Sequence, residues 1–227
     1  MGRLAIVFSL LVVLTLLGIK LYVKEGDREA FWDSWARDWE EMIQHDKDEM
    51  DKTMGVIPLF GLREGETVLD AGCGTGGLIP LLLKEVGRSG CVYGLDLSQE
   101  MLRIARQKHC DGNVSFLKGD IIEIPLPSES MDRIVCFRTF AHIDDKIGAL
   151  REFFRVLKPS GIVVICNLLC SKELNELHKE IGGAIANDTS PGVKEMEQFF
   201  LESNFTPVEL LDSDTLYIMK AQKPVRP

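Results

Sequence analysis

The stretch VLDAGCGTGG, residues 68–77, decides the fold, because an apolar run ends in an acid and then in a loop crowded with glycines. Gly72, Gly74 and Gly77 satisfy the spacing G-x-G-x-x-G, which is typical of a nucleotide-binding loop between a strand and a helix. Glycine lets the backbone turn sharply and approach a ligand, and the helix that follows offers free N–H groups. The spacing alone does not say which nucleotide cofactor binds.

Outward from this loop, strands and helices alternate. Short apolar runs predict strands at 67–72, 91–97, 114–120, 132–138, 162–169, 205–213 and 215–223, the last two joined by a turn at 212–214. Amphipathic segments predict helices at 77–87, 98–110, 171–182 and 193–203, and one that begins at Asp145 and is stopped by Pro159 and Gly161. Strands separated by single helices indicate an α/β fold with a doubly wound, mostly parallel sheet. Such sheets bind ligands beyond the carboxyl ends of their strands.

Length and charge narrow the class of protein. The chain has 227 residues, a net charge of −9 and 45% hydrophobic residues, enough for one well-buried domain. The acidic balance and the lack of a basic run in the body of the chain argue against a nucleic-acid partner. The six cysteines include no CxxC pair, so we expect mostly buried, reduced thiols and no metal site.

The N-terminus is predicted to be a membrane anchor, residues 1–26. Residues 4–19 carry no charge, and the apolar run continues to Val23, so residues 4–23 are long enough to span a bilayer. A cleaved signal peptide and a wrongly assigned start are the alternatives. The basic residues favour a single-pass anchor with the C-terminal domain in the cytoplasm.

Residues 27–57 are predicted to be an amphipathic helical lid or linker. Helical periodicity runs from Asp27 to about Lys52, and one face carries Trp32, Trp35, Trp39, Met42 and Ile43. Three interpretations stay open: a helix packed on the domain, a lid over the ligand, or an interfacial helix beside the membrane. The remainder, residues 58–227, is predicted to be the ligand-binding domain.

Acids stand at three successive strand ends. Asp70 precedes the glycine loop and suits an ammonium group better than a phosphate, while Asp96 can accept hydrogen bonds from ribose hydroxyls. Asp120 and the amide of Ile121 can bind an adenine edge. Leu97 and Met101 are placed to pack against the adenine face. The mixture favours an amino acid joined to a nucleoside.

These residues carry a family resemblance. VLDAGCGTGG, GLDLS, GDIIEIPLPSESMDRIVC and LREFFRVLKPSGIVVI resemble class I S-adenosylmethionine-dependent methyltransferases, in particular the ubiquinone/menaquinone C-methyltransferase-like branch (methyltransferase type 11). The resemblance is close over residues 58–168 and implies a Rossmann-like sheet of seven strands, the last one antiparallel. It says little about the substrate.

The resemblance also implies roles for individual residues. Asp70 and the Gly72–Gly76 loop, which contains Cys73, Gly74 and Gly76, would hold the methionine part of S-adenosylmethionine, Asp96 the ribose, and Asp120 and Ile121 the adenine. The segment of Cys136, Phe137 and Arg138 would pass beside the sulfonium. Arg138-Thr139-Phe140 departs from the smaller residues expected there, and PSG at 159–161 replaces the commoner PGG.

Methyl transfer requires a base only if the acceptor must lose a proton. His142, which follows the fourth strand, and His178, on a helix in the region that usually shapes the acceptor pocket, are the two candidate catalytic residues. Arg138 could hold an acidic or phenolate substrate or pair with Asp144 or Asp145. The anchor favours a small, apolar or membrane-associated methyl acceptor, such as a quinone precursor, lipid or alkyl thiol.

Two rival functions remain. An NAD-dependent oxidoreductase would explain the glycine spacing and Asp96, but not Asp70, and the chain has no Tyr-x-x-x-Lys pair. A membrane-tethered protein that binds the cofactor without catalysis is the second rival, and turnover of any acceptor would exclude it.

Overall fold

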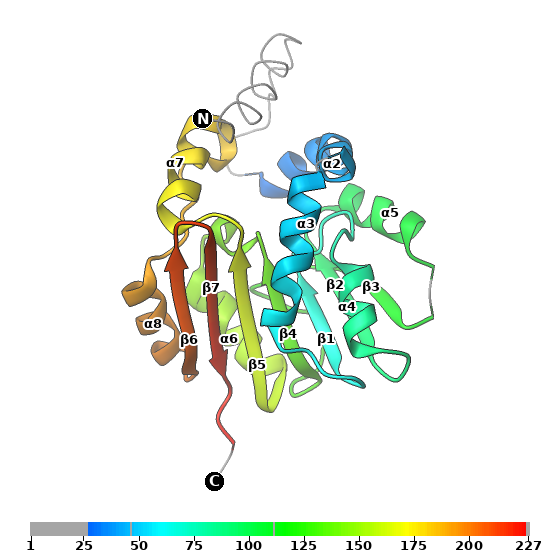
Figure 1. Ribbon diagram of the computed structural model, residues 1–227, viewed down its shortest axis with the longest axis vertical. Helices are drawn as coiled ribbons and strands as arrows, with labels where there is room; N and C mark the ends of the chain where they lie inside the picture. Colours follow the sequence, from blue (N-terminus) through cyan, green and yellow to red (C-terminus); the bar gives the residue numbers. More distant parts are fainter. Residues whose placement is uncertain (1–26, 46, 111, 226–227) are drawn as a thin grey trace.

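The computed structural model describes residues 27–45, 47–110 and 112–225 (Figure 1). The predicted membrane segment, residues 4–23, lies outside these ranges. Over the ranges that are described, no helix combines the length and the apolar character needed to cross a bilayer.

A seven-stranded sheet forms the centre of the molecule, in the order β3-β2-β1-β4-β5-β7-β6. Its strands are β1 (Thr67–Ala71), β2 (Cys91–Asp96), β3 (Val114–Lys118), β4 (Met131–Phe137), β5 (Leu157–Asn167), β6 (Thr206–Ser213) and β7 (Leu216–Gln222). β7 runs antiparallel to both of its neighbours, and the other pairings are parallel. The predicted doubly wound sheet with an antiparallel last strand is therefore confirmed. The strand order reverses between β1 and β4, and this is where such sheets bind ligands.

Helices cover both faces of the sheet (Figure 1). Over the domain they are η1 (Ile57–Phe60), α4 (Ile79–Val86), α5 (Gln99–Lys108), η2 (Phe140–His142), α6 (Lys146–Val156), α7 (Ser171–Ile181), η3 (Gly183–Ile185) and α8 (Val193–Glu202). Buried side chains of α6 and α8, such as Phe153 and Phe200, pack with one face of the sheet. Those of η1 and α4, such as Phe60 and Leu82, pack with the other. The six cysteines are free, and Cys73, Cys136 and Cys166 are buried.

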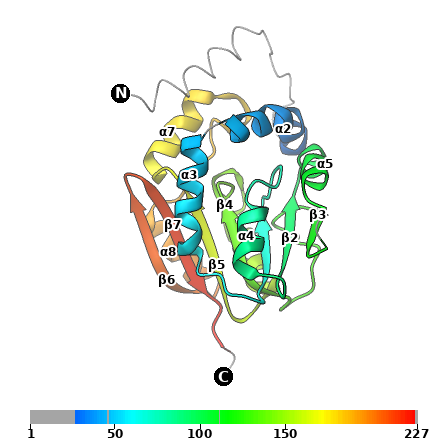
Figure 2. The ribbon, with the colours of Figure 1, turned by 45° about the vertical axis from the view of Figure 1, so that its right-hand side comes forward.

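The segment predicted as one helix from Asp27 to about Lys52 forms two, α2 (Arg28–His45) and α3 (Lys47–Val56). They have different packing partners. α2 lies across the carboxyl ends of the strands, whereas α3 runs down over one face of the sheet (Figures 1 and 2). Glu40 of α2 forms an ion pair with Lys108 of α5 at 2.7 Å. The tryptophan helix thus packs on the domain.

Two predicted boundaries were wrong. α6 ends at Val156, not at Pro159 and Gly161, because Leu157 already pairs with Met131 and begins β5. Pro159 lies inside β5, beside a shift in register against β4, a place where a strand tolerates the missing N–H of proline. The turn between β6 and β7 falls at residues 214–215, because β6 continues through Ser213.

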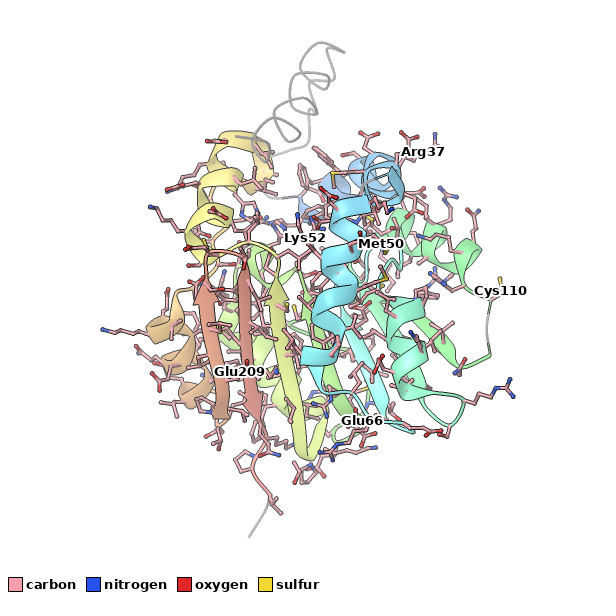
Figure 3. The ribbon with its side chains drawn as sticks, in the orientation of Figure 1. Arg37, Met50, Lys52, Glu66, Cys110 and Glu209 are labelled. Carbon is pink, nitrogen blue, oxygen red and sulfur yellow. The ribbon has the colours of Figure 1, made fainter. Side chains whose placement is uncertain are left out.

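A buried ion pair links two strands at the end of the sheet opposite α2. Arg133 of β4 donates from Nε and an Nη atom to the two carboxylate oxygens of Glu66, at 3.1 and 2.9 Å. The Arg133 side chain is 6% exposed and that of Glu66 is 15% exposed. Glu66 lies directly before β1 (Figure 3), so the pair joins the two central strands.

We predict that Arg133→Met destabilises the protein by about 3 kcal/mol, because the Glu66 carboxylate would stay in a poorly solvated place without its partner. Chemical denaturation measures the change. Arg103→Met is the matched control, since the Arg103–Glu100 pair is about 40% exposed on each side and its loss should cost less than about 0.5 kcal/mol. Equal losses in the two variants would contradict the role given to burial.

Candidate functional site

The glycine loop after β1 is fixed by its neighbours. The amides of Gly72 and Cys73 donate to the carbonyl of Leu95 at 2.8 and 2.9 Å. Gly72 has a φ of 82°, and a Cβ there would lie 2.3 Å from the side chain of Thr139. A residue other than glycine would therefore force the loop after β4 away from the loop after β1.

Asp70, at the tip of β1, is a buried carboxylate that faces the site. Its residue is 2% exposed, and its Oδ2 has no hydrogen-bond partner among the residues that the structure describes. Burial, and then the charge of Asp96, raise the pKa of Asp70 to about 8. A buried carboxylate oxygen without a donor is a place for a cationic ligand group, and an ammonium group fits.

Asp96, at the end of β2, holds two loops at once. Its Oδ2 accepts from the amide of Gly74 at 2.8 Å and its Oδ1 from the amide of Ser98 at 2.9 Å. Burial outweighs these hydrogen bonds and raises the pKa of Asp96 to about 6. Each carboxylate oxygen has a second lone pair, which can accept from ribose hydroxyls.

The four residues predicted to bind the adenine ring all line the same cavity. Leu97 and Met101 approach from the end of β2 and from α5, and Asp120 and Ile121 from the loop after β3. Asp120 accepts from the amide of Ile122 at 3.1 Å, which shapes this loop. Asp120 is exposed and Ile121 is buried. A polar group can therefore meet the edge of an adenine ring while an apolar side chain meets its face.

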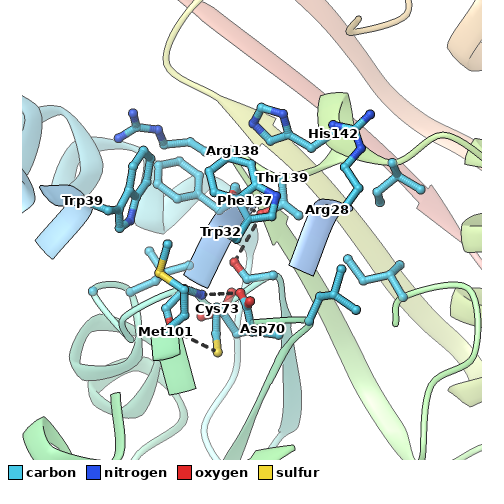
Figure 4. Close-up of a pocket in the computed structure, with 18 of the residues that line it drawn as sticks. Arg28, Trp32, Trp39, Asp70, Cys73, Met101, Phe137, Arg138, Thr139 and His142 are labelled. Carbon is cyan, nitrogen blue, oxygen red and sulfur yellow. Dashed lines mark hydrogen bonds between the residues drawn. The ribbon is translucent and has the colours of Figure 1, made fainter. Parts of the chain in front are cut away.

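These groups line one cavity of about 340 Å³ at the carboxyl ends of the strands (Figure 4). The size is within the usual range for small-molecule sites. α2 and α3 supply its outer wall, through Trp32, Trp39, Ile43, Glu49, Met50 and Thr53. Helix α2, which carries the three tryptophans, therefore packs on the domain and also covers the cavity.

Arg138 occupies the cavity wall in an uncommon backbone conformation, with a φ of 59°. Its guanidinium lies 5.1 Å from the ring centroid of Trp39 and forms an ion pair with Glu49 of α3. Non-glycine residues in this region cost free energy and are held there by their surroundings. Here Arg138 joins the loop after β4 to both covering helices.

The two candidate histidines lie beside each other but differ in access. The rings of His142 and His178 are 4.8 Å apart. His142 lines the cavity. His178 does not, and it is 3% exposed, with Nδ1 at 2.9 Å from the carbonyl of Asp188. Burial lowers the pKa of His178, so it is a buried neutral ring rather than a group that meets the ligand.

The structure brings most of the predicted cofactor residues to the cavity, with two exceptions. Gly76 does not line it, and a Cβ there would lie 2.9 Å from the ring of His109, so this glycine serves the packing against α5. Cys136 is wholly buried in the core on the side of α6. Its neighbour Phe137 lines the cavity instead, because side chains alternate along a strand.

Sequence reasoning missed three contributors to this site. Arg28 and Thr139 line the cavity, and the carboxylate of Asp188 binds the Nδ1 of His142 at 2.6 Å. The face of α2 that covers the cavity could be predicted, because Trp32 and Trp39 are seven residues apart and so lie on one side of the helix. Nothing local marks Arg28, whose partner Asp188 is 160 residues away.

The fold and the site together define a class of protein. A seven-stranded sheet of this order, with a glycine loop after β1 and buried acids at the ends of β1 and β2, is typical of a class I S-adenosylmethionine-dependent methyltransferase. Residues 62–208 match the methyltransferase domain family, and the chain belongs to that family. S-adenosylmethionine is accordingly its cofactor, and the residues present fit it.

Relatives and solved structures agree with this assignment. The chain is 39% identical over 110 residues to a demethylmenaquinone methyltransferase of Staphylococcus aureus, covering 48% of this chain and 46% of that protein. It is 36% identical over 108 residues to one from Listeria monocytogenes, 46% of each protein. The chain thus matches about half the length of these curated relatives.

Among solved structures, an S-adenosylmethionine-dependent methyltransferase from Aquifex aeolicus is 26% identical, with a TM-score of 0.68 over 84% of this chain and 98% of that chain. A Haloferax volcanii protein described as a methyltransferase, solved in complex with an activator, has a TM-score of 0.69 at 21% identity, over 89% of this chain and 99% of the matched chain. The second likeness concerns the fold alone.

We predict that Asp96→Ala weakens binding of S-adenosylmethionine and S-adenosylhomocysteine at least tenfold, or about 1.4 kcal/mol. The variant loses the carboxylate that is expected to accept from the ribose, and it loses the hydrogen bond that orders Gly74. Calorimetric titration of the full chain measures the effect, and NAD is the control ligand, which should not bind. Binding of NAD alone would contradict the assignment of the cofactor.

We predict that Asp70 couples cofactor binding to pH. Its pKa of about 8 means that Asp70 is mostly protonated at neutral pH and must lose a proton to pair with an ammonium group. Affinity should rise from about pH 6 to about pH 8 with release of a proton, which calorimetry in buffers of different ionisation enthalpy detects.

Asp70→Asn is the control for this dependence. It should bind the cofactor more weakly and release no proton. It should also gain stability relative to the wild type as the pH rises from about 4 to about 8, because a carboxyl with a raised folded-state pKa costs folding stability across the interval between its unfolded and folded pKa values. Proton release that persists in Asp70→Asn would assign the effect to another group.

Proposed function

We propose that the protein transfers a methyl group from S-adenosylmethionine to a small, apolar, ring-bearing acceptor. The observation that carries the proposal is the apolar lining of the cavity, which combines Trp32, Trp39 and Met50 of the outer wall with Phe137 at the end of β4. Aromatic and thioether side chains present broad apolar surfaces to a flat ring. The curated relatives are named for a quinone substrate, which supports a lipophilic acceptor here.

The chain contributes positioning and exclusion of water to this reaction. The cofactor, when bound, supplies a methyl group on a positively charged sulfur. Asp70 and the glycine loop fix the methionine end against the sheet, and α2 and α3 cover the cavity from outside. Holding two reactants in line in a dry site accounts for much of the rate of such a displacement.

The N-terminal segment bears on where in the cell the protein acts. We propose that residues 4–23 anchor the protein in a membrane and that the domain lies on the cytoplasmic side. Arg28, which lines the cavity, follows Val23 by five residues. Because a chain extends by at most about 3.5 Å per residue, the cavity would then lie within roughly 20 Å of the bilayer.

The rim of the cavity supports entry of an apolar acceptor. Met50 of α3 is 38% exposed and Ile122 is 43% exposed, and both line the cavity. Exposed apolar side chains at the mouth of a site are typical of contact with an apolar ligand or surface.

We predict that Met50→Glu lowers kcat/KM for a short-chain naphthoquinol by roughly tenfold, because a charge at the rim must be desolvated when the ring passes. The affinity for S-adenosylmethionine should not change. Transfer of labelled methyl into the organic phase measures turnover by the full chain.

Met54→Glu is the matched control, because Met54 lies one turn further along α3, is 46% exposed and does not line the cavity. It should leave turnover unchanged. No transfer to any apolar acceptor by the unaltered chain would overturn the proposed function. For the anchor, residues 27–227 should lose activity on a long-chain quinol in vesicles but not on the soluble analogue, and equal activity on both would count against it.

A further inference from the structure

Charged and titratable side chains from four separate segments meet at one side of the cavity. Arg28 comes from the start of α2, His142 from η2, His178 from α7 and Asp188 from the loop after η3. Arg28 donates to both carboxylate oxygens of Asp188, at 2.8 and 2.6 Å. The function proposed above does not account for a cluster of this kind.

Asp188 is the buried centre of the cluster. Its side chain is 2% exposed. Burial opposes its ionisation, but the hydrogen bonds from His142 and Arg28 outweigh burial and hold the pKa of Asp188 below its ordinary value. An ionised carboxylate can only accept hydrogen bonds. The Nδ1 atom of His142 that faces Asp188 must therefore carry a hydrogen.

His142 is held in one orientation with one nitrogen left over. Its Nδ1 lies 2.6 Å from the Asp188 carboxylate, and its ring packs edge to face against Trp32, with 4.9 Å between the ring centroids. In the part of the chain that the structure describes, Nε2 makes no hydrogen bond, and the residue lines the cavity. Since the carboxylate fixes the proton on Nδ1, the neutral ring carries its lone pair on Nε2.

We propose that His142 is the general base for methyl transfer, that Asp188 is its positioning residue, and that the acceptors are protic, of the phenol or hydroquinol class. The inference rests on the proposed function and names the substrate class of the same site. Acceptors that attack without losing a proton, such as tertiary amines and thioethers, have no use for this arrangement.

The step balances as follows in atoms and charge. His142 Nε2 takes the proton of the acceptor hydroxyl, and the oxygen keeps the electron pair. The anion attacks the methyl carbon through oxygen or through the ring carbon that shares its charge, as the carbon–sulfur bond breaks and its electron pair goes to sulfur. For attack through carbon, the ring proton leaves to solvent, which restores the aromatic ring, and the oxygen takes back the proton held on His142. For attack through oxygen, the imidazolium is stabilised by Asp188 until its proton leaves to solvent.

Other charged groups surround this pair. Asp144 accepts from Arg28 at 2.8 Å, Lys146 is close enough for Asp188 and Asp144 to act on its charge, and His178 lies behind the ring. A purely structural role for the cluster would tie the start of α2 to the loop after η3 and nothing more. The test must therefore separate loss of a base from loss of packing.

The first experiment compares two acceptors of the same shape with His142→Gln. For a phenol that is protonated at the assay pH, kcat should fall by about 100-fold or more, which is typical for loss of a general base. For the matching aryl thiol, already ionised at that pH, kcat should fall by less than about fivefold. Equal losses with the two acceptors would overturn the proposal.

The second experiment needs no turnover. A nitrophenol that absorbs differently as phenol and phenolate is titrated into the full chain with S-adenosylhomocysteine present. The wild type should bind it with a larger ionised fraction than it has free in solution, and His142→Gln should not. An unchanged spectrum in the wild type, with binding shown by calorimetry, would overturn the role of His142.

Asp188→Asn tests the positioning role. It should lower kcat for the phenol by roughly tenfold and leave kcat for the ionised aryl thiol within about twofold, because only the phenol needs an oriented base. A structural role alone would lower kcat for both acceptors alike. Should this buried variant fail to fold, Arg28→Lys, which keeps the charge but loses the two-point contact, should also lower kcat for the phenol more than for the thiol, and equal losses with the two acceptors would overturn the positioning role.

The two proposals fail in different ways. If the wild type methylates neither the phenol nor the thiol, the proposed function is wrong. If it methylates both, and His142→Gln loses both equally, the function stands and the base is wrong.

Discussion

The carboxylate of Asp96 is the constraint on which the site depends. It orders the glycine loop through Gly74 and the start of α5 through Ser98, although burial makes its charge costly. The hydroxyl of Ser98 accepts from the amide of Met101 at 3.1 Å, which caps α5. The same hydroxyl donates to Asp33 of α2 at 2.5 Å. One buried acid therefore connects the cofactor loop, a helix cap and the helix that covers the cavity.

The opposite side of the cavity is organised by a different balance of charge. There Asp188 is kept ionised by donors on two sides, Arg28 and His142, whereas the Oδ2 of Asp70 has no hydrogen-bond partner in the described part of the chain and the pKa of Asp70 is raised. A buried carboxylate whose oxygens are all hydrogen-bonded fixes the geometry of its partners. One that lacks donors can bind a cationic group of a ligand. The site thus uses buried aspartates for two purposes, and the difference comes from the charge and the hydrogen-bond donors that surround each one.

Sequence reasoning predicted that Asp70, Asp96 and Asp120 lie together, and all three line the cavity. The signals for this prediction, glycine spacing and an acid at each strand end, are local and require no knowledge of tertiary contacts. It misplaced Cys136, since the face of a strand that meets the ligand depends on which helices cover it. It could not pair Arg28 with Asp188, because that contact depends on how α2 crosses the sheet.

The position of α2 and α3 along the chain has a consequence for how this enzyme could diversify. Both helices precede residue 62, where the match to the family begins, yet they form the outer wall of the cavity. The glycine loop and the acids at the strand ends, by contrast, belong to the sheet and to the loops that follow its strands. Exchange of one N-terminal helical pair for another would therefore change the acceptor while the methyl-donating half of the enzyme stays intact, a modular route to new specificity.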